Sequence, residues 1–223
     1  MIAERLVAVR RDVADACARA GRDPASVKLV AVSKTMPVEA LQAAYDAGQR
    51  VFGENYAQEL RDKARALPAD VEWHFIGRLQ ANKAKYVAPV AARVHALEAA
   101  DQAAALAARL PPERMLNVLI SVNVGGEDTK GGVAPAALPA AVDAISAVPG
   151  IRVVGLMTLP PPREDPAEMA PFFAELAALA AAERARGRGE ITELSMGTSH
   201  DYAFAIVHGA TWVRVGTAIF GAR

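Results

Sequence analysis

Eight short apolar segments, each separated from the next by a helix-like segment, run along nearly the whole chain. They are rich in Val, Ile, Leu and Phe in near-continuous runs, a pattern typical of parallel strands buried on both faces. The segments cover residues 27–33, 50–53, 71–77, 93–97, 115–124, 151–159, 191–197 and 211–221. Eight strand–helix units in about 200 residues favour a closed (β/α)8 barrel over an open doubly wound sheet.

The segments between these strands have helical periodicity and end at glycine or proline, as Gly48 and Pro68 illustrate. They cover residues 37–47, 54–67, 79–87, 99–110, 135–148, 166–186 and 201–208. An extra N-terminal helix, stopping at Gly21, is predicted by apolar residues spaced for one helix face. Because no linker or shift in composition divides the chain, we expect residues 1–223 to form one barrel domain.

Charge and composition exclude several classes of function. The chain has 25 basic and 25 acidic residues and no block of like charge, so we expect neither nucleic acid nor an anionic membrane as a partner. Charged residues interrupt the N-terminal segment, and no later stretch reaches the roughly 18 apolar residues of a membrane span. Cys17 is the only cysteine, which suits a reducing compartment. We therefore expect a cytoplasmic protein, and a monomer because nothing marks an interface.

Glycines and hydroxyl residues follow the seventh and eighth predicted strands, where barrels of this class often bind phosphate. The stretch Ser-Met-Gly-Thr-Ser-His-Asp covers residues 195–201, and Gly216 and Thr217 follow the last strand. Backbone N–H groups and hydroxyls in such loops can converge on an anion. Each motif alone is more often an ordinary turn or helix cap, but their joint placement predicts a phosphate site.

Lys34 follows the first predicted strand and opens into the same end of the barrel. A lysine desolvated near other cations has a lowered pKa and becomes an amine that can form a Schiff base. A phosphate site beside such a lysine predicts pyridoxal phosphate as cofactor. Arg214, two residues before Gly216, could pair with a core carboxylate or donate to the pyridine nitrogen of that cofactor.

Six motifs then closely resemble those of the YggS/PROSC family, the pyridoxal phosphate homeostasis proteins. They read AVSKTMP, FGENYAQE, WHFIGRLQANK, GLMTLP, LSMGTSHDY and VRVGTAIFGAR, and the resemblance runs from about Lys28 to the last residue. It implies a barrel of the alanine-racemase N-terminal-domain type, fold type III among pyridoxal phosphate proteins, with the cofactor held as a Schiff base on Lys34. It also implies that Asn55 lies beside the cofactor ring and that Arg214 faces the pyridine nitrogen. Ser199, Gly216 and Thr217 would hold the phosphate.

Two positions depart from the pattern of that family. Thr198 stands where the family usually has methionine, and Ala203 stands where glutamate is common. Lys34, Arg214 and the Gly-Thr pair are intact, so we expect cofactor binding to be kept.

Two functions from different classes are open. The resemblance implies a carrier or regulator of pyridoxal phosphate, without a dedicated reaction, that would pass the cofactor to apo-enzymes. The alternative is an amino-acid racemase, which needs two positioned acid/base groups. In alanine racemases the second group is a tyrosine from a C-terminal domain, for which this chain leaves no room after Arg223. We therefore expect a non-enzymatic protein.

Four further residues carry weaker hypotheses. His74 lies on a predicted buried strand and is expected to be a satisfied core residue. Lys83 is equally consistent with the mouth of the site and with a solvated helix face. Lys130, in a glycine-rich loop after the fifth strand, could attract anionic ligands, although such a lysine is usually only exposed. The histidines, His95 among them, lack metal-ligand spacing, so we expect no metal site.

Overall fold

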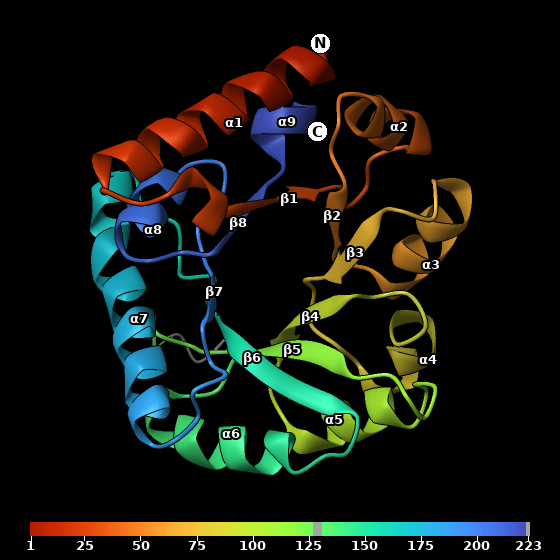
Figure 1. The fold of residues 1–223 in the computed structure, drawn as a ribbon, viewed down its shortest axis with the longest axis vertical. Coiled ribbons are helices and arrows are strands. Elements are labelled where there is room, and N and C mark those ends of the chain that lie inside the picture. Colours follow the sequence, from red (N-terminus) through yellow and green to blue (C-terminus); the bar gives the residue numbers. More distant parts are fainter. Residues whose placement is uncertain (127–130, 222–223) are drawn as a thin grey trace.

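A closed barrel of eight parallel strands, paired in chain order, forms the centre of the molecule (Figure 1). This computed structural model describes residues 1–126 and 131–221. Strand β1 pairs with both β2 and β8, which closes the barrel and confirms the predicted (β/α)8 fold. The strands are β1 (Lys28–Val32), β2 (Val51–Glu54), β3 (Glu72–Phe75), β4 (Arg93–Leu97), β5 (Leu116–Ser121), β6 (Ile151–Met157), β7 (Glu193–Ser195) and β8 (Trp212–Val215).

Helices surround the barrel on its outside, and Figure 1 shows them following one another around the ring. Their apolar faces pack on the outer face of the strands, so the main core lies between the two layers. The helices are α1 (Ile2–Arg19), α2 (Val38–Asp46), α3 (Ala57–Ala66), α4 (Ala84–Val87), α5 (Ala100–Ala107), α6 (Leu138–Ser146), α7 (Ala170–Ala185), α8 (Tyr202–Val207) and α9 (Thr217–Phe220).

The predicted extra N-terminal helix is α1, which packs against α8 and α9 (Figure 1). Its buried face is the one that the spacing indicated, with Leu6, Val9, Val13 and Cys17 each less than a tenth exposed. Burial also raises the pKa of the Cys17 thiol, so this cysteine acts as an apolar core residue. The helix therefore covers the barrel where β8 meets β1.

Several predicted boundaries differ from the structure. Residues 79–87 form a short 3-10 turn, Ala81–Lys83, followed by the single turn α4, because Gln80 is extended and Pro89 cannot continue the helix. The last predicted strand ends at Val215, and its remainder forms α9. Glu54 belongs to β2 and not to the following helix, which turns its side chain into the protein.

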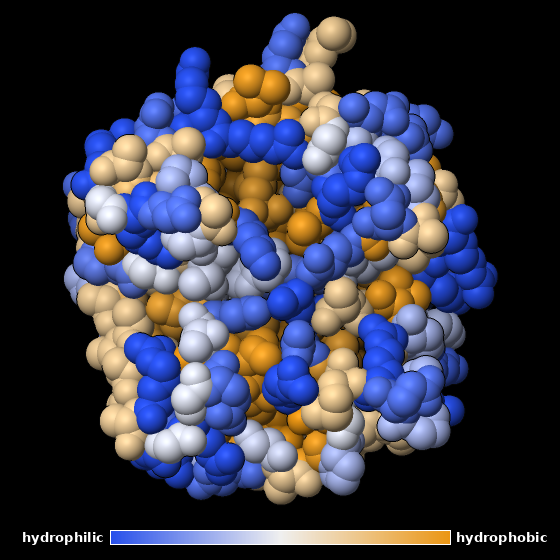
Figure 2. Space-filling model, viewed as in Figure 1, coloured by the Kyte–Doolittle hydropathy of each residue, from blue (hydrophilic) through white to orange (hydrophobic). Residues whose placement is uncertain are grey.

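One face of the molecule carries hydrophilic residues around hollows in which hydrophobic residues are visible (Figure 2). Within residues 1–126 and 131–221, no helix combines the length and the apolar character needed to cross a membrane.

Candidate functional site

A cavity of about 290 Å³ opens where the first, second, seventh and eighth strands end. All six residues that the sequence nominated line it: Lys34, Asn55, Ser199, Arg214, Gly216 and Thr217. Apolar side chains, including Ile76 and Met157, form the rest of the wall together with Thr198 and His200. The barrel therefore brings an amine, a guanidinium and two hydroxyl-bearing loops into one hollow.

The backbone on both sides of Lys34 is fastened to neighbouring elements. Ser33 is fully buried, and its hydroxyl donates to Oε1 of Glu54 at 2.6 Å. The Thr35 N–H donates to Oε2 of Glu59 on α3 at 2.8 Å. Thr35 has φ of 63°, a left-handed conformation that is costly for a β-branched residue and persists only where the surroundings impose it. These contacts fix the position from which the Lys34 side chain leaves the chain.

Lys63 on α3 connects the residues that hold the backbone around Lys34. Its Nζ donates to Glu54 at 2.8 Å, to Glu59 at 2.6 Å and to the Ser33 carbonyl at 2.8 Å. Burial raises the pKa of Glu54 even though the bonds from Lys63 and Ser33 act in the opposite direction. Burial would also raise the pKa of Glu59, but its bonds to Lys63 and Thr35 together hold that pKa below the ordinary value.

Sequence reasoning missed this ion-pair network. The one available signal was the spacing of Glu59 and Lys63, four residues apart, which is typical of a pair on one helix face. That pattern normally indicates a solvated pair, and nothing in it predicts that Lys63 is only 7% exposed or that Glu54 lies opposite.

Asn55 contributes a buried acceptor to the cavity. Its Oδ1 has no hydrogen-bond partner among the described residues, although buried polar atoms are nearly always paired. The end of β3 packs directly on the Asn55 backbone, since a Cβ added to Gly77 would lie 2.1 Å from the Asn55 carbonyl oxygen. Gly77 therefore permits a close approach that locates Asn55.

Replacing Gly77 with alanine is expected to lower the free energy of unfolding by about 1–3 kcal/mol, because the clash is with backbone that cannot swing away. Urea unfolding followed by circular dichroism measures the change. Gly189→Ala is the matched control, since a Cβ there meets nothing within 4 Å, and should stay within about 0.5 kcal/mol of the wild type. Equal losses in the two variants would contradict the packing argument.

The loops after β7 and β8 are bonded to each other. The Ser199 hydroxyl accepts from the N–H of Gly216 at 3.2 Å and from that of Ala218 at 3.4 Å. Thr198 donates to the Asp201 carboxylate through both its N–H and its hydroxyl. The hydroxyl at position 198 thus fastens its own loop, which a methionine could not do. Ala203 lies on α8 and does not line the cavity.

Arg214 enters the cavity from inside the barrel and is only 6% exposed. Its Nη1 donates to the Ser195 hydroxyl at 2.6 Å and its Nη2 to the Thr158 carbonyl at 2.9 Å. Within the described part of the chain it forms no ion pair with a carboxylate, so the core-pairing alternative does not describe it. Burial lowers the pKa of Arg214 to about 10, a fall that the more distant charge of Asp201 opposes.

The four residues that carried weaker hypotheses have different outcomes. His74 is a fully buried core residue with both ring nitrogens bonded, as expected. Lys83 is half-buried beside the Tyr86 ring and does not line the cavity. Lys130 lies outside the described residues. Across residues 1–126 and 131–221, no group of His, Cys, Asp and Glu side chains could hold a metal ion.

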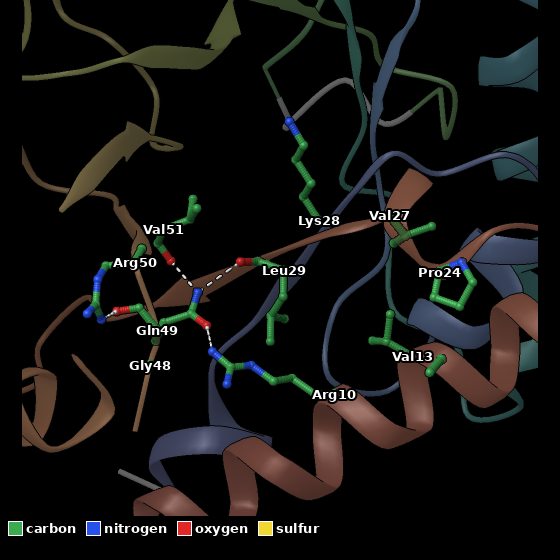
Figure 3. Close-up of a pocket in the computed structure, with 11 residues that line it drawn as sticks. Arg10, Val13, Pro24, Val27, Lys28, Leu29, Gly48, Gln49, Arg50 and Val51 are labelled. Carbon is green, nitrogen blue, oxygen red and sulfur yellow. Dashed lines mark hydrogen bonds between the residues drawn. The ribbon is translucent and has the colours of Figure 1, made fainter. Parts of the chain in front are cut away.

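Two other hollows differ from this site in their polar groups. A cavity of about 270 Å³ adjoins the first, shares Asn55 with it, and carries the ion pair of Arg78 and Glu98 at 3.5 Å. A third, of about 380 Å³, lies between α1, β1 and β2 and contains none of the nominated residues (Figure 3). There Gln49 bridges the Leu29 and Val51 carbonyls and accepts from Arg10, so its amide is saturated by the protein (Figure 3).

Comparison with known proteins identifies the family of this chain. The family "Alanine racemase, N-terminal domain" matches residues 5–223. A pyridoxal phosphate homeostasis protein of Aquifex aeolicus is 43% identical over 99% of this chain and 97% of its own length. One of Pseudomonas aeruginosa is 44% identical over 100% of this chain and 96% of its own.

Solved structures are similar to this chain in fold. PipY of Synechococcus elongatus, solved with pyridoxal phosphate bound, is 35% identical, covers 99% of this chain and 100% of its own, and has a TM-score of 0.83. Alanine racemase of Corynebacterium glutamicum is 21% identical, with a TM-score of 0.68 over 98% of this chain and 61% of its own, and shares the fold. The chain belongs to the pyridoxal phosphate homeostasis protein family, within the larger family of the alanine racemase N-terminal domain.

Proposed function

We propose that this protein binds pyridoxal phosphate in the cavity at the strand ends and serves as a carrier or regulator of that cofactor, not as a dedicated enzyme. The observation that carries the proposal is the meeting of Lys34, Arg214 and the two hydroxyl-bearing loops in one hollow. The pyridoxal phosphate bound to the related PipY supports the same ligand.

The residues present fit this cofactor. The Lys34 amine would add to its aldehyde and release water, which leaves a Schiff base. The hydroxyls of Ser199 and Thr217 and the backbone around Gly216 would hold the phosphate. The buried Oδ1 of Asn55, to which no group in the described part of the chain donates a hydrogen bond, would accept from a ligand hydroxyl or N–H group.

Arg214 determines what chemistry such a site favours. When bound, the cofactor supplies an aldehyde and an electron-accepting ring. Because a pKa of about 10 leaves the Arg214 guanidinium charged at neutral pH, it acts only as a donor and would keep the facing ring nitrogen unprotonated. An unprotonated ring withdraws electrons less strongly, which favours storage of the cofactor over carbanion chemistry.

The racemase alternative requires the second acid/base group that a tyrosine supplies in alanine racemases. A racemase must exchange a proton on opposite faces of its substrate. No tyrosine is among the described residues that line the cavity. We propose further that the protein is a monomer of the cytoplasm that passes the cofactor to apo-enzymes.

The test is the visible absorbance spectrum of the full chain after incubation with pyridoxal phosphate, taken before and after borohydride and followed by peptide mapping. We expect a band that bleaches and a pyridoxyl group on Lys34. A protein that stays colourless would overturn cofactor binding. Conversion of L-alanine to D-alanine by the loaded protein would overturn the carrier role alone.

A further inference from the structure

A continuous chain of hydrogen bonds crosses the inside of the barrel from Arg214 to Glu72. Arg214 Nη1 lies 2.6 Å from the Ser195 hydroxyl, which lies 2.8 Å from Nδ1 of His95. His95 Nε2 lies 2.9 Å from Nδ1 of His74, and His74 Nε2 lies 2.9 Å from Oε1 of Glu72. The three inner residues are fully buried. The chain therefore connects the cavity with the carboxylate that begins β3.

The alternating direction of side chains along the strands places the members of this hydrogen-bond chain inside the barrel. Residues two apart on a strand point to the same face, and four strands each place such a polar pair inside the barrel. The pairs are Glu72 and His74 on β3, Arg93 and His95 on β4, Glu193 and Ser195 on β7, and Trp212 and Arg214 on β8. The second member of each pair belongs to the hydrogen-bond chain, and Arg214 is one of its two ends.

The two ends of the chain fix the direction of every bond in it. A guanidinium only donates, so Ser195 accepts from Arg214. A carboxylate only accepts, so a neutral His74 donates to Glu72 from Nε2 and accepts at Nδ1. A neutral His95 therefore donates to His74 from Nε2, and its own Nδ1 then accepts from the Ser195 hydroxyl. Both histidines are thereby assigned one tautomer.

The electrostatics agree with neutral rings between charged ends. Burial lowers the pKa of His74, and burial together with the neighbouring His74 and Arg214 holds the pKa of His95 well below the ordinary histidine value. The hydrogen bond from His74 lowers the pKa of Glu72 and keeps it an acceptor.

Charged groups surround the outer end of the chain. Arg93 donates to Glu72 at 2.7 Å and also bonds Glu193. Glu193 accepts from the Trp212 indole at 2.8 Å, and Lys28 lies 4.9 Å from the centre of that ring. At the inner end, Asp201 is the carboxylate whose charge acts on Arg214. Among the described residues, the charged groups around the histidines are therefore five besides Arg214: Glu72, Arg93, Glu193, Lys28 and Asp201.

We propose that Ser195, His95, His74 and Glu72 are positioning residues for Arg214, which they hold as a donor facing the bound ligand; this inference rests on the proposed function. A carboxylate in direct contact would engage the guanidinium and compete with the ligand. Three intervening groups give Arg214 a polarised acceptor and leave its positive charge directed at the cavity. Through Arg214, the residues at the far end of the barrel would thus position the hydrogen-bond donor that faces the ring nitrogen of the bound cofactor.

The first test uses the full chain without cofactor. Nitrogen-15 NMR of the histidine side chains should show His74 and His95 as Nε2-protonated tautomers that do not titrate between about pH 6 and pH 8, around the ordinary histidine pKa. The exposed His200 supplies the reference signal of a solvated ring. Titration of His95, or a proton on its Nδ1, would overturn the proposal whatever the cofactor does.

The second test uses the loaded protein. Ser195→Ala, which removes one hydroxyl, and His95→Phe should each shift the absorbance maximum of the bound cofactor and accelerate its release about tenfold. Ser195→Thr, which restores a hydroxyl, should return both properties toward those of the wild type. His208→Phe is the matched control for a histidine that does not line the cavity.

The outcomes separate the two proposals. Unchanged spectra and release rates in Ser195→Ala and His95→Phe, with a normal adduct on Lys34, would overturn the positioning role and leave the proposed function standing. Absence of any bound cofactor in the wild type would overturn the proposed function, and the tautomers measured without cofactor would still decide whether the oriented chain exists.

Discussion

Replacing Lys34 with alanine is expected to abolish the borohydride-trapped adduct completely, because a Schiff base requires a primary amine at that position. The hydroxyl and backbone groups of Ser199, Gly216 and Thr217 remain, so weaker binding through the phosphate should persist. Mass spectrometry of the reduced protein measures the covalent adduct, and equilibrium dialysis measures what binds without it.

Lys83→Ala is the control for this experiment, since that lysine is half-buried but does not line the cavity. It should retain the adduct at wild-type occupancy. Trapping of a pyridoxyl group at wild-type level in Lys34→Ala would show that another amine reacts, and the assignment would then be wrong. Lys63 is a poor substitute, because two carboxylates and a carbonyl already occupy its ammonium group.

The fold was predictable from the sequence because a parallel barrel buries both faces of every strand. That requirement leaves a signal, the near-continuous apolar run, in each of the eight segments. Boundaries were less certain wherever the signal changes within a few residues. At Gly216 the apolar run continues into α9, so periodicity alone could not separate the end of a strand from the start of a helix.

The residues of the site that follow a strand could be predicted from the sequence. Lys34, Ser199 and Gly216 each follow a strand, and the C-terminal ends of parallel strands lie together in any such barrel. Contacts inside the barrel are different, since they depend on tilt and register. His95 and Ser195 are 100 residues apart and touch only because β4 and β7 face each other across the interior. No local pattern contains that information.

Two polar networks therefore support one site from different directions. The network of Lys63 fastens the backbone around Lys34, and the chain from Glu72 fastens Arg214. Both networks bury charged groups where an ordinary core would bury apolar side chains. The desolvation penalty of these charges is offset only while every hydrogen-bond and ion-pair partner is present. Removal of one partner should consequently be felt in stability as well as in binding.

Lys63→Met is expected to lower the free energy of unfolding by about 3–5 kcal/mol, because it leaves the buried carboxylate of Glu54 without its cation. The double variant with Glu54→Gln removes the stranded charge and should be more stable than the single variant. Lys85→Met, an exposed lysine on α4, is the matched control and should change stability by less than about 0.5 kcal/mol. Urea unfolding at neutral pH measures all three. A single variant as stable as this control would mean that Glu54 is neutral in the native protein and that Lys63 positions the Lys34 loop by hydrogen bonds alone.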